Sequence, residues 1–400
     1  NSYGFMTGND HYPELFVGRF SAETVDHVQT MVERVIDYEL YADATATHHE
    51  TSIGIASSQG PGDDNEMDYE HIRNMHTDLL AYTYTAVTEN FDGSQGGLDA
   101  SGNPSASMVA TDINAGCGNI LYTGHGSNTA FSSSGFSNTN VNNLTNTGKL
   151  PFIWSVACVN GNFVSTTCFG EAWTRATHNN QPSGAIAALM ATINQSWDPP
   201  MCGQDEMVDI LVESYTNNIK RTFGGISLNG CMQMVDEYGS GGESMLDTWN
   251  LFGDPAIMVR TATPSSMTIS HAPTVFLGFS QFQVNCDEDD ALVSMTMNNE
   301  ILGTGIASGG IAYLNFPPLS NIGVITITIT AYNKITYVST IDIVPNNGPY
   351  VMMSSFNVND PSPANNNGLA DYAEDISLNI SLSNIGIELA NNVTGILSCS

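Results

Sequence analysis

The sequence predicts an α/β layered domain that is followed by a small antiparallel β-sandwich and by the start of a further, truncated β-sandwich module. Between residues 22 and 260, apolar runs of strand length alternate with segments of helical periodicity, which is typical of a sheet with helices on both faces. After residue 261 the pattern changes to short alternating strands separated by Asn, Gly and Pro. A chain of 400 residues is also too long for one ordinary domain. We expect domains over residues 1–261, 262–346 and 347–400.

The elements of the first domain follow from the spacing of its apolar residues. Residues 22–41 carry valine and isoleucine at helical spacing, whereas residues 52–57 form a short apolar run that ends at the turn Gln59-Gly-Pro-Gly62. The same reasoning predicts the remaining elements in chain order. We expect a helix at 67–80, a strand at 82–87, a helix at 105–115, a strand at 119–125, a short helix near 141, a strand at 150–158, a helix at 169–177, a strand at 184–192, helices at 205–215 and 226–238, a segment at 247–255 and a final strand at 256–260.

The second half of the chain has the pattern of β-sandwich modules. Alternating runs such as residues 324–330 and 336–344 predict strands with one buried face. After the turn at residues 346–349 another β unit begins, with a strand expected at 376–382. These modules carry no catalytic residues in a recognisable pattern, so we interpret them as stalk or attachment modules. The first residues already read as part of a folded segment, so we expect a processed chain or a fragment whose first domain is incomplete at its N-terminus.

Charge excludes several classes of partner. The chain has 41 acidic and 9 basic residues, and its formal net charge is −32. Such a surface repels nucleic acid phosphates and anionic membranes, and it favours basic partners or divalent cations. No run of 18 apolar residues is present, so we expect no membrane span.

The cysteines show no pattern of disulfides or metal ligands. All seven are scattered along the chain and their number is odd, which fits neither a disulfide framework nor a set of zinc ligands. We expect most of them in the core.

Two reactive side chains stand at the ends of predicted strands. His125 closes the run that begins at Asn119, and Cys158 closes the run that begins at Leu150. Because the carboxyl ends of parallel strands meet at one edge of a sheet, we expect the imidazole and the thiol to lie close together. A neighbouring imidazole makes thiolate available near neutrality, and the glycines beside His125 let backbone N–H groups approach a developing oxyanion. A lone Cys at a strand end is usually packing, but the pair predicts a cysteine peptidase.

Five motifs, in order along residues 10–345, resemble the gingipains, which are secreted or cell-surface bacterial cysteine peptidases of caspase-like fold. The resemblance is closer to the arginine-specific gingipains than to the lysine-specific one. It implies a caspase-like layered sheet in the first domain and an immunoglobulin-like β-sandwich in the second. The motifs are Leu15-Phe-Val-Gly-Arg-Phe20, Tyr122-Thr-Gly-His-Gly-Ser127, Pro151-Phe-Ile-Trp-Ser-Val-Ala-Cys-Val-Asn-Gly161, Thr192-Ile-Asn-Gln-Ser-Trp197 and Leu251-Phe-Gly-Asp-Pro255.

The resemblance implies roles for residues of the catalytic centre. Cys158 becomes the nucleophile that forms a covalent acyl-enzyme, and His125 becomes the general base and acid. The backbone N–H groups of Gly126 and Cys158 become the oxyanion donors. The family pattern places a glutamate that orients the histidine where this chain has Gln59, and an amide stabilises imidazolium less than a carboxylate does. We therefore expect activity that is reduced or shifted in pH.

The resemblance also implies an arginine pocket. Asp68 matches the acidic residue that receives the substrate arginine, and Trp197 and Met201 match residues that wall the same pocket. A guanidinium needs a charge-assisted acceptor, and aromatic or thioether groups suit its aliphatic stem. Without the resemblance, Asp68 would read as a solvated helix residue, and Trp197 and Met201 as core. The implied partners are proteins or peptides with arginine before the scissile bond.

Other functions predict different features. A catalytically weak or inactive peptidase-like domain of a surface adhesion protein would lack the nucleophile or the base, and both are present here. An intracellular caspase-like regulator would need a basic pocket, which the scarcity of arginine disfavours. A nucleotide-binding α/β enzyme would need a glycine-rich loop that opens a helix after the first strand, and none is present.

Two acidic runs are the candidate metal ligands of the chain. The proposed reaction requires no cofactor, and no spacing of residues identifies a metal ligand set. Acidic runs at Asp63-Asp64 and Asp287-Glu-Asp-Asp290 offer oxygen ligands, which calcium prefers. Each run taken alone is most simply a solvated loop. The sequence therefore allows structural calcium without identifying its site.

Overall fold

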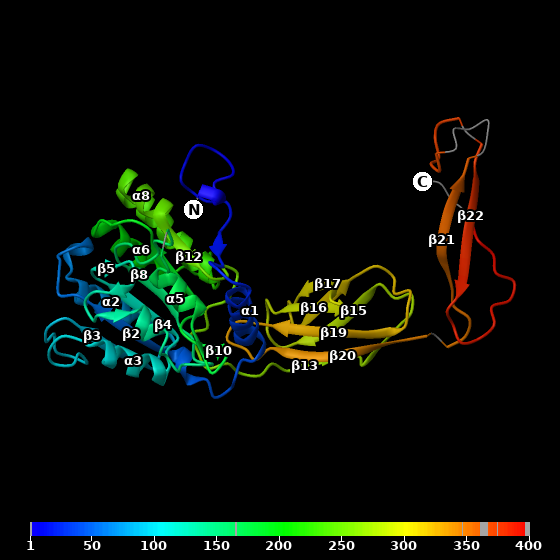
Figure 1. Cartoon of the computed structure of the whole chain (residues 1–400). Helices are drawn as coiled ribbons and strands as arrows, with labels where there is room; N and C mark the ends of the chain where they lie inside the picture. Colours follow the sequence, from blue (N-terminus) through cyan, green and yellow to red (C-terminus); the bar gives the residue numbers. More distant parts are fainter. Residues whose placement is uncertain (1, 165, 346, 361–366, 374, 397–400) are drawn as a thin grey trace. The chain divides into compact units, whose positions relative to one another are not determined.

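The structure, a computed structural model, describes residues 2–164, 166–345, 347–360, 367–373 and 375–396 (Figure 1). The chain divides into two compact units. The first comprises Asn1–Ser266 together with Tyr332–Ile335, and the second comprises Met267–Ala331 together with Thr336–Ser400.

A seven-stranded sheet organises the first unit. Its strands lie in the order β1-β12-β11-β8-β4-β2-β3. All neighbours pair in parallel except β11 and β12, which are antiparallel, so the sheet is mixed. The strands are β1 (Gly18–Arg19), β2 (Thr51–Ala56), β3 (Ala86–Phe91), β4 (Asn119–Thr123), β8 (Phe152–Val156), β11 (Ala187–Ala191) and β12 (Trp249–Phe252).

Helices cover both faces of this sheet, which confirms the predicted α/β layered class (Figure 1). Adjacent strand residues alternate between two cores: Leu121 and Trp154 belong to one, whereas Ile120 and Ile153 belong to the other. The first core is closed by α2 (Asp68–Tyr82), α6 (Asp198–Leu211), α7 (Phe223–Tyr238) and α8 (Ser240–Thr248), and the second by α3 (Ala106–Ala115), α4 (Asn138–Val141) and α5 (Phe169–Arg175).

Several sequence-based expectations for this unit were wrong in detail, among them the strand expected at residues 82–87, which is β3 at Ala86–Phe91. The last strand is β12, and residues 256–260 form only an isolated bridge through Met258. Helix α6 begins at Asp198 and not at residue 205, because Pro199 and Pro200 sit in the first turn, where no intrahelical N–H is needed. Helix α8 was not predicted, because its start, Ser240-Gly-Gly, has low helix propensity.

Helix α1 (Val25–Leu40) forms where expected but buries a different face. Val25 and Val28 of the apolar stripe are exposed, whereas Met31 and Arg34 are buried. The Arg34 guanidinium donates hydrogen bonds to four main-chain carbonyls, which belong to Trp173, Ala176, Ser183 and Ala185. The two terminal nitrogens of this buried guanidinium are hydrogen-bonded to main-chain carbonyls, and the helix therefore turns Arg34 rather than Val25 and Val28 toward the core.

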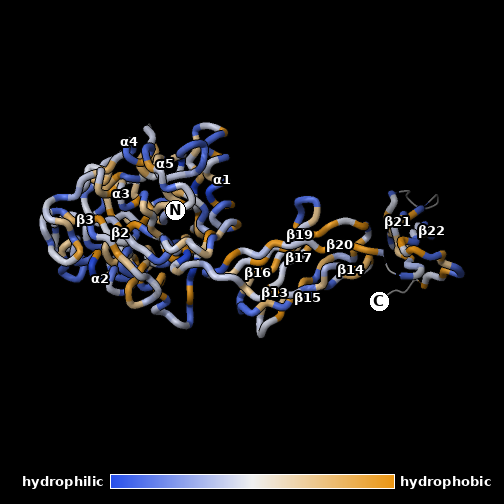
Figure 2. Tube along the Cα trace, turned by 90° about the horizontal axis from the view of Figure 1, so that it is seen from below, coloured by the Kyte–Doolittle hydropathy of each residue, from blue (hydrophilic) through white to orange (hydrophobic). Residues whose placement is uncertain are grey.

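The second unit contains the predicted sandwich. Its sheets have the orders β13-β15-β18 and β14-β20-β19-β16-β17. Along β19 the isoleucines Ile325, Ile327 and Ile329 are buried while the intervening threonines are partly exposed. Hydrophobic stretches run through these strands in Figure 2. The strands are β13 (Ile269–His271), β14 (Thr274–Phe276), β15 (Gln281–Cys286), β16 (Leu292–Met297), β17 (Glu300–Ile306), β18 (Ile311–Asn315), β19 (Gly323–Thr330) and β20 (Tyr337–Val344).

Beyond these strands, β21 (Val351–Asn359) and β22 (Ser377–Asn384) pair antiparallel. The strand expected at residues 376–382 corresponds to β22. The first unit also contains short strands outside its main sheet, in the connection from β4 to β8 and in the connection from β8 to β11. These are β5 (Gly126–Ser127), β6 (Ala130–Phe131), β7 (Phe136–Ser137), β9 (Thr177–His178) and β10 (Gln181–Pro182).

Candidate active site

His125 and Cys158 follow the ends of two paired strands. Strands β4 and β8 are parallel, with Thr123 opposite Val156, and the N–H of Gly124 donates to the carbonyl of Val156 at 3.1 Å. The histidine lies two residues beyond the end of β4 and the cysteine two residues beyond the end of β8. The structure therefore places both side chains at the same carboxyl edge of the sheet, as the strand pattern predicted.

Cys158 sits on a turn that the neighbouring loop holds in place. The side-chain oxygen of Gln195 accepts from the N–H of Ala157 at 3.0 Å, and the Cys158 thiol lies 3.9 Å from the Gln195 carbonyl oxygen. The next residue, Val159, has φ of +52°, a left-handed conformation that costs a β-branched residue about 1–3 kcal/mol. Cys158 is half-buried, whereas the other described cysteines are buried. The turn thus presents one thiol, and Cys399 lies outside the described residues.

Gly126 packs directly against the cysteine turn. A Cβ at this position would lie 2.6 Å from the carbonyl oxygen of Cys158, so only glycine fits. The buried Asn160 side chain joins the same two loops, since it donates to the carbonyls of Ser127 and Ala130 at 2.5 and 3.1 Å. Sequence reasoning missed Asn160, although it lies in the motif around Cys158. This close packing fixes the backbone on both sides of the space between thiol and imidazole.

The His125 side chain is exposed, and its backbone is anchored. The His125 carbonyl accepts from the Tyr122 hydroxyl at 2.5 Å and from the N–H of Ser132 at 3.0 Å. The ring meets the Trp197 indole edge-on, with centroids 5.2 Å apart and planes at 72°. Trp197, Cys158 and Gln195 line one hollow beside Gly124. The cysteine and the tryptophan therefore border one hollow, and the histidine ring lies against the tryptophan.

Asp68 lies at the start of α2 and is completely buried. Its Oδ1 accepts from the Trp197 indole N–H at 2.9 Å, and its Oδ2 accepts from the Ser57 hydroxyl. Burial raises the pKa of Asp68 to about 6, although the hydrogen bonds from Ser57 and Trp197 and the charges of His71 and His125 oppose the rise. Met201 is buried beside Trp197, and the loop at Gly62 contacts both residues. The structure therefore brings together the three residues that the resemblance assigned to one pocket.

Gln59 does not make the contact expected of it. Its side chain is exposed, and its only hydrogen bonds within the described part of the chain are from its N–H to the Ser57 hydroxyl and from the Asp68 N–H to its carbonyl. No described interaction joins the Gln59 amide to His125. Its role as the group that orients the histidine has no structural support.

The two acidic loops show no assembled metal site. Within the described residues, no group of three or more His, Cys, Asp or Glu side chains is arranged to hold a metal ion. Asp63 instead accepts from the Tyr238 hydroxyl, and Asp289 accepts from the N–H of Gly309 at 2.8 Å. These carboxylates are already used by protein donors.

Structural calcium stays a prediction. If one loop closes around the ion, saturating calcium should stabilise the fold by about 2.7 kcal/mol at a hundredfold excess over the dissociation constant. The unfolding midpoint, measured with calcium, with magnesium and with chelator, checks this prediction. Three identical melting curves would contradict it.

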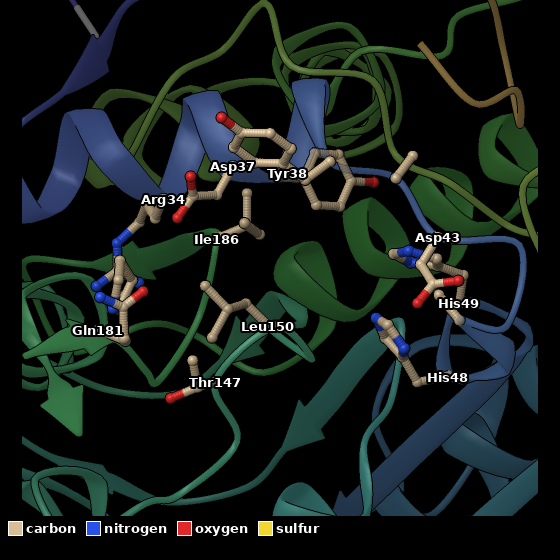
Figure 3. A pocket seen from close by; sticks show the side chains of 15 residues that line it. Arg34, Asp37, Tyr38, Asp43, His48, His49, Thr147, Leu150, Gln181 and Ile186 are labelled. Atoms are coloured by element: carbon tan, nitrogen blue, oxygen red, sulfur yellow. The ribbon is translucent and has the colours of Figure 1, made fainter. Parts of the chain in front are cut away.

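A larger cavity of about 380 Å³ lies away from these residues (Figure 3). It is bordered by His49, Leu150 and Ile186, each of which shortly precedes a strand of the sheet. The cavity is therefore at the amino edge of the sheet, opposite the edge that carries Cys158. It contributes nothing to the chemistry of the thiol.

Comparisons with known proteins all place the chain in one peptidase family. Residues 1–260 match peptidase family C25, and residues 271–344 match the C-terminal Ig-like domain of that family. The chain is 40% identical over 356 residues to gingipain R1 of Porphyromonas gingivalis, covering 88% of this chain and 35% of that protein. It is 38% identical over 374 residues to gingipain R2 of P. gingivalis strain ATCC 33277, covering 90% of this chain and 50% of that protein. The chain thus spans half or less of the length of these curated relatives.

The fold comparison agrees. A crystal structure of the Arg-specific cysteine proteinase gingipain R is 38% identical, with a TM-score of 0.82 over 86% of this chain and 78% of that one. Lys-gingipain of P. gingivalis is only 21% identical over 343 residues. These values confirm that the resemblance is closer to the arginine-specific gingipains. None of the helices in the described part of the chain has the length and apolar character that crossing a bilayer requires.

Proposed function

The chain belongs to peptidase family C25, and from this premise we propose that it is a cysteine endopeptidase that cleaves peptide bonds after arginine through Cys158 and His125. The observation that supports it most is the position of these two residues at adjacent strand ends, beside a fully buried Asp68 that bonds to Trp197. The three groups provide a nucleophile, a proton carrier and an acceptor for a cationic side chain.

The first half-reaction uses the Cys158–His125 pair. The Cys158 thiolate attacks the scissile carbonyl carbon, and the thiol proton resides on the His125 imidazole. The N–H groups of Gly126 and Cys158 donate to the oxyanion that develops on the carbonyl oxygen. Among the described residues, no group accepts from the Cys158 N–H, so this donor is free for the substrate. His125 then gives its proton to the leaving amine, and the acyl-enzyme remains.

The second half-reaction releases the acyl group. His125, now neutral, takes a proton from a water molecule that attacks the thioester carbon. The tetrahedral intermediate collapses, and the Cys158 thiolate leaves. The exposure of His125 allows water to reach it, and the hydrogen bond from Tyr122 anchors its main chain at the sheet edge that carries the thiol. The free carboxylate product departs, and the pair returns to its starting state.

Specificity for arginine comes from Asp68. The substrate guanidinium enters beside Trp197 and replaces the indole N–H as a donor to the Asp68 carboxylate. The faces of Trp197 and the thioether of Met201 cover the aliphatic stem of the arginine. A buried carboxylate gains most from a cationic ligand, because no water screens the pair.

A panel of fluorogenic peptides that differ only in the residue before the cleaved bond tests this proposal. We expect rapid cleavage after arginine, much slower cleavage after lysine, whose compact ammonium cannot form the paired bonds, and none after glutamate or leucine. Equal rates across the panel would contradict a pocket built on Asp68. The panel also separates a peptidase from an inactive surface-binding domain, which would cleave no member.

The titration of Asp68 predicts an acid limb. Its pKa is raised by burial to about 6, so the pocket becomes neutral as the pH falls through that value. We expect kcat/KM for an arginyl substrate to fall tenfold per pH unit below about pH 6, mainly through KM. A matched peptide with citrulline, which is uncharged, should show a weaker dependence. Superimposable acid limbs for the two peptides would show that Asp68 does not bind the substrate charge.

A further inference from the structure

Gln59 does not contact His125, so a different group must orient the imidazole if its position is fixed. The charged or titratable groups that face it come from three elements. Asp68 on α2 and Asp92, which follows β3, both interact electrostatically with the imidazole, and Cys158 follows the neighbouring strand β8. Trp197 adds an uncharged ring edge. Two carboxylates therefore lie within electrostatic reach of the histidine.

Only one of these carboxylates has a free oxygen. Both oxygens of Asp68 already accept hydrogen bonds, one from Ser57 and one from Trp197. The Oδ1 atom of Asp92 is buried, and it accepts no hydrogen bond from any residue that the structure describes. A buried carboxylate oxygen without a donor is unfavourable, so it calls for a partner.

The main chain holds Asp92 at the catalytic edge of the sheet. Its N–H donates to the carbonyl of Ala56 at 2.9 Å, and its carbonyl accepts from the Gln95 side chain at 2.6 Å. Ala56 is the last residue of β2, and it pairs with Thr123 at the end of β4. Asp92 and His125 therefore flank the end of β2 from its two neighbouring strands.

We propose that Asp92 is a positioning residue that orients the His125 imidazole, directly or through one water molecule, in the role that the family pattern gives to a glutamate at position 59. A carboxylate that accepts from one ring nitrogen directs the other nitrogen at the thiol and stabilises the imidazolium. The inference rests on the proposed peptidase function, because that function gives His125 its role as the proton carrier. It also explains how the chain keeps a carboxylate near the histidine although residue 59 is glutamine.

A measurement without turnover tests the contact itself. In a Cys158→Ala background, the Cε1 proton of His125 is followed by NMR as a function of pH, and the resonance is assigned by its loss in His125→Gln. Asp92→Asn should move the titration midpoint about one unit lower, because imidazolium loses a stabilising negative charge. Asp78→Asn, which removes an exposed carboxylate on α2, should leave the midpoint in place. An unchanged midpoint in Asp92→Asn, or an equal shift in both variants, would overturn the proposal.

Kinetics then separate positioning from simple structural damage. For an arginyl substrate, Asp92→Asn should lower kcat on the order of 10- to 100-fold with KM within about twofold, and it should move the alkaline limb of kcat/KM about one unit lower. Asp92→Glu should restore part of the loss. Gln59→Glu should move the limb by less than Asp92→Asn does, and a larger effect at position 59 would count against Asp92. If the wild-type chain cleaves nothing while the NMR shift is present, the peptidase function fails and the contact stands.

Discussion

Cys158→Ala is expected to abolish peptide hydrolysis, with a loss in kcat on the order of 10⁴-fold or more. The reason is that no other described side chain at this edge of the sheet can form the acyl-enzyme. Ser196 lines the same hollow as Cys158, and Ser155 lies in β8 three residues before it, but their hydroxyl groups are much less acidic than a thiol, and the Ser155 hydroxyl is buried and donates to Asn160. The measurement is initial-rate kinetics on an arginyl amide substrate with the wild-type and variant chains side by side.

An active-site label provides the control for this result. An arginyl chloromethyl ketone should modify Cys158 in the wild-type chain and nothing in the variant, as read by peptide mass mapping. The other described thiols are buried, and burial raises the pKa of Cys168 to about 12, so they carry little thiolate. Full turnover in Cys158→Ala would refute the assignment of the nucleophile. An inactive wild-type chain that also resists labelling would instead favour a peptidase-like domain that only binds.

The order of layers could be predicted from the sequence because the central strands are apolar on both faces. Leu121 and Trp154 alternate with Ile120 and Ile153, and such runs have few alternatives to a buried sheet. Edge elements were harder to predict. Strand β3 lies at the edge of the sheet and carries Glu89 and Asn90, so the expected strand at residues 82–87 was placed too early.

This misplacement explains why the sequence did not point to Asp92, the proposed positioning residue. With β3 ending at Phe91, Asp92 stands at the end of its strand, as His125 and Cys158 nearly do on theirs. A rule that searches for polar residues just after each strand would have included it, but only with the correct strand boundary. The burial of Asp68 could not be predicted either, because the donors that satisfy it, Ser57 and Trp197, are far apart in the chain.

Asp68→Asn is expected to lower kcat/KM for arginyl substrates by roughly 30-fold to several thousand-fold, which corresponds to about 2–5 kcal/mol for stranding one partner of a buried charge pair. The substituted amide keeps the shape of the side chain but presents no net charge to the guanidinium. The loss should appear for arginine and be small for citrulline. Comparison of the two substrates on the two proteins measures the charge interaction itself.

The same substitution should stabilise the folded chain at neutral pH. Burial raises the pKa of Asp68 from its ordinary value of 3.8 to about 6, so the folded state holds a proton more tightly than the unfolded state. The stability that this site contributes is therefore complete below pH 3.8 and is lost as the pH rises through about 6. A shift of this size corresponds to roughly 3 kcal/mol at pH 8, since each unit is about 1.4 kcal/mol. The amide of Asp68→Asn does not ionise, so the variant keeps this stability as the pH rises. Its free energy of unfolding should exceed that of the wild type at about pH 8 and match it near pH 4.

A matched variant distinguishes a binding role from burial alone. Asp205 on α6 is half-buried, and desolvation also raises its pKa to about 6, but its carboxylate is bonded to neither Trp197 nor Ser57. Asp205→Asn should therefore gain stability at neutral pH and keep its activity toward arginine. Asp68→Asn should gain stability, because it removes a buried charge that is unfavourable in the absence of substrate. It should also lose activity toward arginine, because the same charge binds the substrate cation. Loss of arginyl turnover in both variants, or in neither, would show that Asp68 is a structural carboxylate and that the substrate charge is met elsewhere.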